Sequence, residues 1–289
     1  MMVVKNLSFT YGKGTAHECR VLEDVSFEIN EGEFIGLIGS SGSGKTTLIK
    51  HLNGLLKADS GDILFQGRSI YDKNYVLSNL RKEVGLVFQY PEQQLFKSTV
   101  LGDVAFGPQN LGMSKEEAEK AAKDSLKLVG MDESDYYVSP LELSGGQKRC
   151  VAIAGVLAMN PKILVMDEPA AGLDPGTRDM IYRLVNKIKR ERNISIMLVS
   201  HHMEDVAEYA DKVLVMYKNK LVRTGTVREI FSQTEYLKSI GIGVPQITSV
   251  TERLIKAGLD LGHPAVTVDE AEELICRELN RLKGKGKDE

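Results

Sequence analysis

The sequence predicts an α/β protein with a parallel sheet, an antiparallel β subdomain at its N-terminal end, a helical subdomain and a small helical C-terminal extension. Two observations carry this prediction. Apolar runs alternate with a helical stretch in the second half of the chain, which is the spacing of βαβ units. Near the N-terminus, a glycine-rich segment follows an apolar run and leads into a helical stretch, so one loop joins a strand to a helix.

The N-terminal strands are indicated by a period-two alternation of apolar and polar side chains in Val3–Tyr11 and Val21–Ile29. We expect these two runs to pair in the antiparallel direction, joined by the loop Gly12–Arg20. A helix is expected from Thr47 to about Leu56. Short apolar runs predict further strands at Phe34–Ile38, Ile63–Phe65 and Val84–Phe88.

The second half of the chain contains three more apolar, partly β-branched runs, Ile163–Met166, Ile196–Val199 and Val213–Tyr217. The helical stretch Thr177–Arg190 separates the first two, so we expect parallel strands in one sheet. Helical patterns dominate residues 90–160. Within them, Ser114-Lys115-Glu116-Glu117 is a capping box, which predicts a helix that ends near Gly130.

The character of the chain changes after Gly243, because no strand-like run follows. We therefore expect residues 1–243 to form one large domain, with the helical subdomain at about 90–160, and residues 244–289 to form the extension. A second capping box at Thr267–Glu270 precedes an apolar stripe that consists of Ala271, Ile275, Leu279 and Leu282. This stripe either packs on its own domain or holds a partner subunit. Lys283–Lys287 is expected to be a flexible, solvated tail.

The composition is that of an ordinary globular protein, with 42% hydrophobic and 27% charged residues. A net charge of −3 does not favour wholesale nucleic-acid binding. No apolar run reaches the length of about 20 residues that spans a bilayer, and the first residues do not form a signal peptide. Because Cys19, Cys150 and Cys276 are far apart, the sequence predicts no disulfide framework and favours a reducing cytosol.

The glycine-rich segment fits the phosphate-loop pattern G-x-x-x-x-G-K-[ST]. Its residues, together with the next residue of the helix, are Gly39, Ser40, Ser41, Gly42, Ser43, Gly44, Lys45, Thr46 and Thr47. Glycines let backbone N–H groups turn toward phosphates, and the helix N-terminus adds positive potential. We expect Lys45 to reach the β- and γ-phosphates of ATP and the Thr46 hydroxyl to bind Mg²⁺. A chance glycine-rich turn is the alternative, but the flanking strand and helix favour a nucleotide site.

Two carboxylates, Asp167 and Glu168, follow the buried run Ile163–Met166. Asp167 is expected to lie beside Mg²⁺, as a Walker-B aspartate does. Glu168 is expected to orient and deprotonate the attacking water. An acidic strand end is common by itself, so this interpretation depends on the phosphate loop upstream.

The segment Leu143-Ser144-Gly145-Gly146-Gln147 predicts a second anion-binding helix start, because Ser144 can cap the helix that follows. Simple phosphate-loop kinases and GTPases have no counterpart of this second site. Here the sequence resembles the ATP-binding cassette (ABC) ATPases, and the resemblance covers residues 3–232 or so. It implies a P-loop NTPase of the ABC type, whose nucleotide-binding domain is residues 1–243. It also implies that the Ser144–Gln147 helix faces the γ-phosphate bound by the other subunit of a sandwich dimer.

The resemblance implies roles for four further residues. Tyr11 resembles the aromatic residue that stacks on adenine, although a strand aromatic can also belong to the core. Gln89 resembles the glutamine that senses Mg²⁺ and the water, and His201 resembles the histidine that contacts the γ-phosphate. The segment Ala171-Gly172-Leu173-Asp174 resembles the loop that crosses the dimer interface, and Asp174 is its last residue.

Two residues depart from the pattern of this family. Ala170 stands where Thr or Ser is common after Asp-Glu-Pro. His202 stands where Asp is common after the switch histidine, which leaves open whether His201 or His202 reaches the phosphate.

Residues 89–112 are similar to the cobalt and energy-coupling factor (ECF) transporter ATPases, through the elements Pro-Glu-x-Gln-Leu-Phe and Phe-Gly-Pro-x-Asn-Leu-Gly. The similarity is greatest to the second ATPase of such a module. It implies a peripheral subunit at the cytoplasmic face of the cell membrane that powers uptake of a vitamin or a transition-metal ion. The implied partners are a sister ABC ATPase in a heterodimer, a transmembrane coupling protein and a substrate-binding membrane protein, and no nucleic acid.

We expect residues 90–106 to form an apolar groove that receives an amphipathic helix of the membrane partner. Glu92 and Asp103 are expected at its rim, where one of them would pair with a basic residue of that helix. The apolar residues assigned to this groove are Leu95, Phe96, Val100, Val104 and Phe106.

Two other classes of protein fit the sequence less well. An ABC motor that acts on DNA or ribosomes is disfavoured, because the chain has one phosphate loop and no sustained heptads between Lys45 and Ser144. A nucleotide-binding scaffold that does not hydrolyse ATP is disfavoured because Glu168 and His201 are both present.

Overall fold

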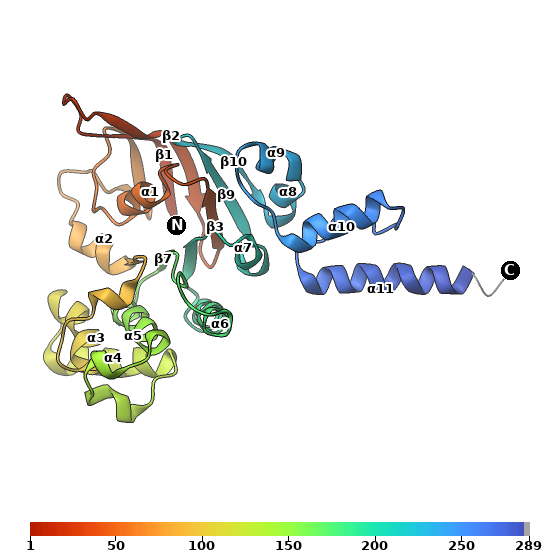
Figure 1. Cartoon of the computed structure of the whole chain (residues 1–289). Coiled ribbons are helices and arrows are strands. Elements are labelled where there is room, and N and C mark those ends of the chain that lie inside the picture. The colour runs from red at the N-terminus through yellow and green to blue at the C-terminus, as the bar shows by residue number, and fades with distance from the viewer. Residues whose placement is uncertain (286–289) are drawn as a thin grey trace.

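The computed structural model describes residues 1–285, with side chains as far as Lys283, and its strands form two sheets (Figure 1). The first sheet has the order β2–β1–β4–β5, and all its pairings are antiparallel. The expected pairing of the two N-terminal runs is confirmed, and the strand predicted at Ile63–Phe65 lies on the other side of β1. The strands are β1 (Met2–Tyr11), β2 (Cys19–Ile29), β4 (Ser60–Phe65) and β5 (Arg68–Ser69).

The second sheet has the order β10–β9–β3–β8–β7–β6, and its neighbours pair in parallel except for β9 and β10. The predicted α/β class with a parallel sheet is therefore confirmed. The edge strand β10 was missed, because its sequence mixes Lys, Arg, Thr and Gly without apolar alternation. The strands are β3 (Phe34–Gly39), β6 (Val84–Val87), β7 (Ile163–Asp167), β8 (Ser195–Val199), β9 (Lys212–Tyr217) and β10 (Lys220–Thr226).

Both faces of the central parallel strands are buried, which explains their unbroken apolar runs. In β7, Val165 packs into a core that includes residues of the antiparallel sheet, whereas Met166 packs into a core shared with helices. Helix α1 (Lys45–Leu52) contributes Leu48 to the first core. One face of the parallel sheet is covered by the antiparallel sheet and α1, and the other face is covered by helices. This packing on both faces supports the loops at the carboxyl edge of the sheet.

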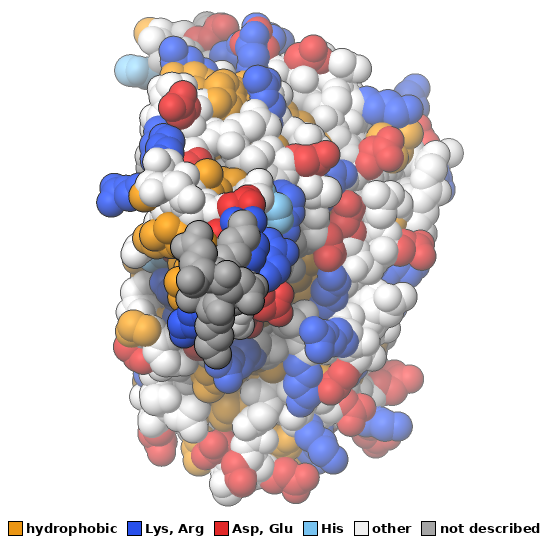
Figure 2. Space-filling model, turned by 90° about the vertical axis from the view of Figure 1, so that its right-hand side faces the viewer, with side chains coloured by type: hydrophobic (Ala, Val, Ile, Leu, Met, Phe, Trp, Pro, Cys, Tyr) orange, Lys and Arg blue, Asp and Glu red, His pale blue; other side chains and the backbone are white. Residues whose placement is uncertain are grey.

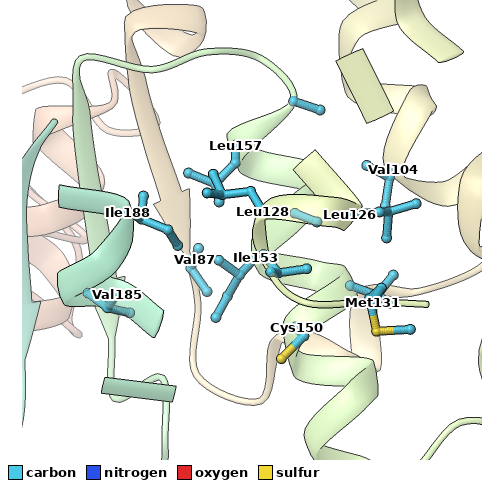
Figure 3. Packing of buried hydrophobic residues seen from close by; sticks show 14 of the residues in the cluster. Val87, Val104, Leu126, Leu128, Met131, Cys150, Ile153, Leu157, Val185 and Ile188 are labelled. Atoms are coloured by element: carbon cyan, nitrogen blue, oxygen red, sulfur yellow. The ribbon is translucent and has the colours of Figure 1, made fainter. Parts of the chain in front are cut away.

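The second core joins the parallel sheet to the helical subdomain (Figure 3). Val87 of β6 lies among Ile153 and Leu157 of helix α5 (Gly145–Leu157) and Ile188 of helix α6 (Pro175–Arg192). Burial of such aliphatic side chains contributes about 1.5–3 kcal/mol each. This packing fixes the position of α5 relative to the sheet.

The helical subdomain is the lobe at the lower left of Figure 1. The predicted capping box is confirmed, since the Ser114 hydroxyl accepts from Glu117 N–H at 3.3 Å and the Glu117 carboxylate accepts from Ser114 N–H at 2.9 Å. Besides α5, its elements are η1 (Pro91–Gln94), α3 (Val100–Asn110), α4 (Lys115–Leu128), η2 (Glu133–Tyr137) and η3 (Pro140–Glu142).

Helix α1 is shorter at its C-terminal end than the sequence suggested. Gly54 adopts a left-handed φ of 68°, and its N–H donates to the His51 carbonyl at 3.0 Å. The N–H of Leu55 donates to the Lys50 carbonyl at 2.9 Å. These two bonds make a Schellman motif, which ends the helix at Leu52 rather than near Leu56.

Several short helices were missed by sequence reasoning, because helices of five to seven residues are too short to show a clear periodicity. They are α2 (Leu77–Glu83), α7 (Met203–Tyr209), α8 (Val227–Phe231) and α9 (Thr234–Ser239).

The C-terminal extension consists of α10 (Gln246–Lys256) and α11 (Val268–Lys285), which project to the right in Figure 1. As expected, its described residues contain no strand. The expected flexible tail is wrong at its start, because α11 continues to Lys285, and the rest of that prediction lies outside the described residues. A contact of 2.7 Å between Glu278 and Arg281 stabilises the last turns of α11.

The capping box expected at Thr267–Glu270 forms differently from the prediction. The Thr267 hydroxyl accepts from Glu270 N–H at 3.3 Å, as expected. The Glu270 carboxylate instead accepts from Val266 N–H at 2.8 Å and pairs with Arg228, which ties the extension to α8.

The apolar stripe of α11 is divided into two parts. Ala271 and Ile275 pack within the extension itself, beside Leu261. Leu279 and Leu282 are exposed at 44% and 48%. Figure 2 looks onto this end of the molecule, where hydrophobic side chains lie among charged ones.

Candidate nucleotide-binding site

The loops that follow four strands meet at the carboxyl edge of the parallel sheet. In the ladder, Val199 of β8 lies opposite both Leu37 of β3 and Asp167 of β7, and Val87 of β6 lies opposite Met166. The phosphate loop, Gln89, Glu168 and His201 follow these strands directly. In open α/β sheets this edge is where ligands bind, so the sheet itself gathers the predicted site.

The phosphate loop leads from β3 into α1 and is shaped by glycine. Gly44 occupies the N-cap position of α1 with a φ of 98°, a left-handed conformation that favours glycine. A Cβ atom at Gly44 would also lie 2.5 Å from the Val21 carbonyl oxygen. Gly42 has a φ of 73° as well. This backbone can direct successive N–H groups toward one anion.

The Lys45 side chain is buried at the base of this loop. Its ammonium donates to the carbonyl oxygens of Gly39 at 2.8 Å and Ser40 at 3.0 Å. Burial lowers the pKa of Lys45, whereas the charges of Glu168 and Asp167 oppose this shift. A phosphate group in the cavity would add a further negative partner for this ammonium.

Asp167 and Thr46 form the second polar contact of the site. The Thr46 hydroxyl donates to Asp167 Oδ2 at 2.9 Å. Burial raises the pKa of Asp167, while the Thr46 hydrogen bond and the Lys45 charge act against it. A divalent cation held between the hydroxyl and the carboxylate would offset the burial of this charge.

Gln89 and His201 both contact the Glu168 carboxylate, which follows Asp167 in the chain. His201 Nε2 lies 2.8 Å from Glu168 Oε1, and Gln89 Nε2 donates to Glu168 Oε2 at 3.4 Å. His202 instead lines a different cavity with Arg178 and Glu204. The structure therefore brings His201, and not His202, to the site.

Tyr11 faces the same cavity, so the alternative that it is a core aromatic is wrong. Its side chain is 39% exposed and its hydroxyl lies 3.4 Å from Thr47 Oγ1. Val21 of β2 lines the cavity beside it and was missed, because nothing in a strand's apolar pattern distinguishes a side chain at a ligand site. The cavity measures about 530 Å³ and is lined by Tyr11, Val21, Ser41, Gly42, Ser43, Gly44, Lys45, Thr46, Thr47, Gln89, Asp167, Glu168 and His201.

A buried hydroxyl in the loop tests whether these residues fit a nucleotide. Ser43 Oγ is buried without a hydrogen-bond partner, which is costly for a polar atom. A phosphate oxygen would provide its acceptor. Among residues 1–285, no three His, Cys, Asp or Glu side chains cluster so that they could hold a metal by themselves. Thr46 and Asp167 present a hydroxyl and a carboxylate oxygen 2.9 Å apart, which are ligands that suit Mg²⁺ together with oxygens of a bound nucleotide.

The second predicted helix start lies at α5, away from this cavity. Ser144 caps α5 as expected, because its hydroxyl accepts from Gln147 N–H at 3.3 Å. The Gln147 side chain accepts from Ser144 N–H at 3.0 Å, which completes a capping box. Ser144 and Gly145 are exposed, and a Cβ atom at Gly145 would meet nothing within 4 Å.

Asp174 and Ala170 lie in the loop between Glu168 and α6. The Asp174 carboxylate caps α6 by accepting from the Thr177 hydroxyl at 2.6 Å and from Thr177 N–H at 3.0 Å, and these bonds lower its pKa. Ala170 is buried in the core shared with the helices. At position 170, where Thr or Ser is common, the alanine methyl group packs in this core without needing a hydrogen-bond partner.

The apolar groove expected in residues 90–106 forms from only some of the residues assigned to it. Val100 and Val104 are buried in the core, and Phe96 is exposed at 62%. Leu95 and Phe106 do line a cavity of about 250 Å³ between η1, α3 and α5.

Asp103 lines this cavity, as expected, and both carboxylates that were expected at the groove rim have partners within the chain. Asp103 accepts from the N–H groups of Phe96 at 2.8 Å and Lys97 at 2.7 Å. Glu92 is paired with the buried Arg149 at 2.6 Å, a contact that no local pattern revealed.

The fold and the cavity define a nucleotide-binding protein of the phosphate-loop class. The family model described as ABC transporter matches residues 22–171. The chain is 49% identical over 280 residues to the energy-coupling factor transporter ATP-binding protein EcfA2 of Caldanaerobacter subterraneus, a match that covers 97% of this chain and 98% of that protein. It is 47% identical over 281 residues to EcfA2 of Clostridium acetobutylicum, and this match covers 97% of this chain and 98% of that protein. This chain belongs to the ABC transporter family, among the energy-coupling factor ATP-binding proteins.

Solved structures agree with this placement. CbiO1 from Clostridium perfringens, part of the ABC transporter complex cbiONQ, is 35% identical with a TM-score of 0.73 over 87% of this chain and 98% of that one. The dimeric ATP-binding cassette MJ0796, bound to ADP and Pi, is 30% identical with a TM-score of 0.69 over 79% of this chain and 99% of that one. The predicted ABC-type fold is confirmed.

Proposed function

We propose that this chain is the ATP-hydrolysing subunit of an energy-coupling factor importer. The observation that carries the proposal is the contact of Glu168 with His201 and Gln89 at the mouth of the phosphate loop. A carboxylate held between an imidazole and an amide, beside Lys45 and Asp167, suits a general base that acts on water next to a γ-phosphate. Relatives named as transporter ATP-binding proteins support the same function.

In this proposal the phosphate loop binds and orients ATP. Lys45 and the backbone N–H groups of Ser41–Thr47 hold the phosphates, and Tyr11 stacks on the adenine beside Val21. Thr46, Asp167 and Gln89 hold Mg²⁺, which would neutralise charge on the phosphate oxygens. Glu168 takes a proton from the attacking water, and His201 contacts the γ-phosphate.

The helix start of α5 completes the site of a second ATPase subunit. Ser144, Gly145, Gly146 and Gln147 would face the γ-phosphate bound by the partner, while the loop that ends at Asp174 crosses the interface. The exposure of Ser144 and Gly145 supports this role. A dimeric relative, MJ0796, supports assembly in pairs. We propose a heterodimer with a sister ATPase.

The membrane partners are a transmembrane coupling protein and a substrate-binding membrane protein, which selects a vitamin or a transition-metal ion. No helix among the described residues is long and apolar enough to cross a membrane. We propose that the chain binds at the cytoplasmic face through its partners, as its similarity to transporter ATP-binding proteins supports. The cavity beside Leu95 and Phe106 is the proposed docking groove for an amphipathic helix.

Reconstitution with both membrane partners in vesicles tests this function. ATP hydrolysis and substrate uptake are measured together for the wild-type chain and for Glu168→Gln, and both activities should fall together in the variant. Glu116→Gln, on the exposed face of α4, is the matched control and should keep both. Uptake that persists without hydrolysis would contradict the proposal.

The docking groove has a separate test. Phe96→Ala removes an exposed aromatic ring that packs edge-to-face on Phe106 of the groove, and it should reduce uptake while hydrolysis by the isolated ATPase dimer persists. Tyr137→Ala, which removes a 66% exposed ring elsewhere in the same subdomain, is the control. Equal uptake by the two variants would place the docking site elsewhere.

A further inference from the structure

Arg149 is the largest fully buried side chain of the described residues, and its guanidinium lies between two segments of the site. On one side it binds Glu92 of η1 in a bidentate pair, from Nε at 3.0 Å and from Nη2 at 2.6 Å. On the other side Nη1 donates to the carbonyl oxygens of Pro169 and Ala171, each at 2.9 Å. Only the planar fork of arginine can reach all these acceptors at once.

The loop that Arg149 holds is the one that presents Glu168. Glu168 has a φ of 48°, a left-handed conformation that is unfavourable for a residue with a side chain. Its carbonyl accepts from Ala171 N–H at 3.0 Å, which closes a turn. Arg149 binds two other carbonyls of that same turn, so it stabilises the backbone on which the Glu168 carboxylate depends.

The segment on the other side of Arg149 borders the proposed docking groove. Glu92 lies in the single turn of η1, and Pro91 and Gln94 of this turn line the groove. Gln89, which contacts Glu168, lies two positions before the first residue of this turn. A displacement of η1 would therefore act on Glu168 by two routes, through Gln89 and through the pair of Glu92 with Arg149.

We propose that Arg149 is a positioning residue that links the groove segment η1 to the backbone of the Glu168 turn, so that the geometry of the catalytic carboxylate depends on what occupies the groove. This inference rests on the proposed function, because it gives Glu168 the role of the base. Arg149 touches neither the phosphate loop nor the nucleotide cavity. It acts through Glu168 and Gln89.

Arg149→Lys and Glu92→Gln test the link in the reconstituted complex. Lysine keeps the charge but loses the fork, and glutamine keeps the shape of Glu92 but loses the ion pair. Both should lower kcat, by roughly 10–100-fold for Arg149→Lys, the effect of misplacing a catalytic group by about 1 Å. The KM for ATP should stay within about twofold, because the phosphate loop is untouched. Glu142→Gln, at an exposed position of η3, is the control.

A double variant with Glu168→Gln distinguishes a positioning role of Arg149 from general damage to the fold. In a Glu168→Gln background, Arg149→Lys should cause no further loss of the residual hydrolysis, because its target is already inactive. A further loss of the same size would overturn the proposal, as would an unchanged kcat in either single variant. If Arg149→Lys fails to fold, Glu92→Gln carries the test, since its side chain is partly exposed. A wild-type complex that does not hydrolyse ATP would instead refute the proposed function.

Discussion

The two serine- and glycine-rich helix starts of this chain, at α1 and α5, differ in what surrounds them. At α1, the cavity contains a buried lysine, two carboxylates, an amide and an imidazole. At α5, Ser144 and Gly145 face outward, and the Ser144 side chain is engaged by its own capping box. Both starts offer N–H groups to an anion, but only the first has groups that bind a cation and activate water.

This difference indicates a division of labour. The α1 site can bind a nucleotide with residues of one chain. The α5 start has only its N–H groups and one hydroxyl to offer, so it is useful when another chain presents a phosphate to it. We therefore expect the two starts to be independent for nucleotide binding and dependent on each other for hydrolysis.

The largest effect is expected at the catalytic carboxylate of the α1 site. Glu168→Gln should slow hydrolysis by roughly 10²–10⁴-fold, the usual contribution of a positioned general base. ATP binding should persist, because Lys45 and the loop are intact, and the ATP-bound dimer should become more stable. Single-turnover kinetics and light scattering with ATP measure the two quantities. A wild-type rate would show that Glu168 is not the base.

Removal of the buried ammonium tests the α1 site as a phosphate site. Lys45→Ala should weaken ATP binding by at least about 10²-fold, because charge-assisted bonds to phosphate oxygens are worth about 1.5–3 kcal/mol each. Titration calorimetry measures this affinity. Lys57→Ala, an exposed lysine beyond the same helix, is the control. Unchanged affinity in Lys45→Ala would remove the basis of the nucleotide site.

A carboxylate introduced at the start of α5 should affect ATP hydrolysis by the dimer without lowering folding stability. Gly145→Asp meets open space and lies in the first turn of α5, where a negative charge favours the helix dipole. Folding stability should be kept, and ATP binding by the isolated chain should be unchanged. Hydrolysis by the dimer should fall by roughly 10–100-fold, because in the proposed dimer the new charge would face the γ-phosphate of the partner's nucleotide.

The matched variant for this position is Gly145→Asn, which adds a side chain of similar size without charge. It should retain more hydrolysis than Gly145→Asp. Equal activity of the two variants would mean that no anion approaches α5, and the comparison of the two helix starts would fail.

The smallest effect is expected at the extension, which we propose holds the two ATPase subunits together without nucleotide. Leu279→Asp combined with Leu282→Asp places charges on the exposed half of the α11 stripe. Subunit affinity should fall by about tenfold, since two exposed leucines bury a modest area. Hydrolysis at saturating subunit concentration should persist. Light scattering of nucleotide-free protein measures assembly, and an unchanged dimer would assign the stripe no such role.

Much of the site could be predicted because its pieces are contiguous. The phosphate loop, the capped helix start at Ser144 and the paired carboxylates at the end of β7 each depend on the sterics of neighbouring residues, so their residue types reveal them directly. The boundaries were less predictable. Gly54 ends α1 through a Schellman motif that apolar periodicity does not show.

The groove shows what sequence reasoning could not supply. The sequence indicates Glu92 and Asp103 as carboxylates at a groove rim, but it does not indicate the partners that they have within the chain. In the fold, Asp103 binds the backbone of Phe96 and Lys97, and Glu92 binds Arg149 from 57 positions away. Nothing local to either carboxylate indicates these partners.

The sequence by itself determined the α/β class, the phosphate loop and the capped helix start at Ser144, since each follows from periodicity, capping or glycine backbone freedom within a few residues. Only the tertiary structure decided that His201 rather than His202 meets Glu168, that Tyr11 faces the cavity, and that Arg149 ties Glu92 to the turn that follows Glu168. These contacts join residues from different strands and helices. Their geometry depends on the register and packing of the whole sheet, which places side chains within hydrogen-bonding distance however far apart they lie along the chain.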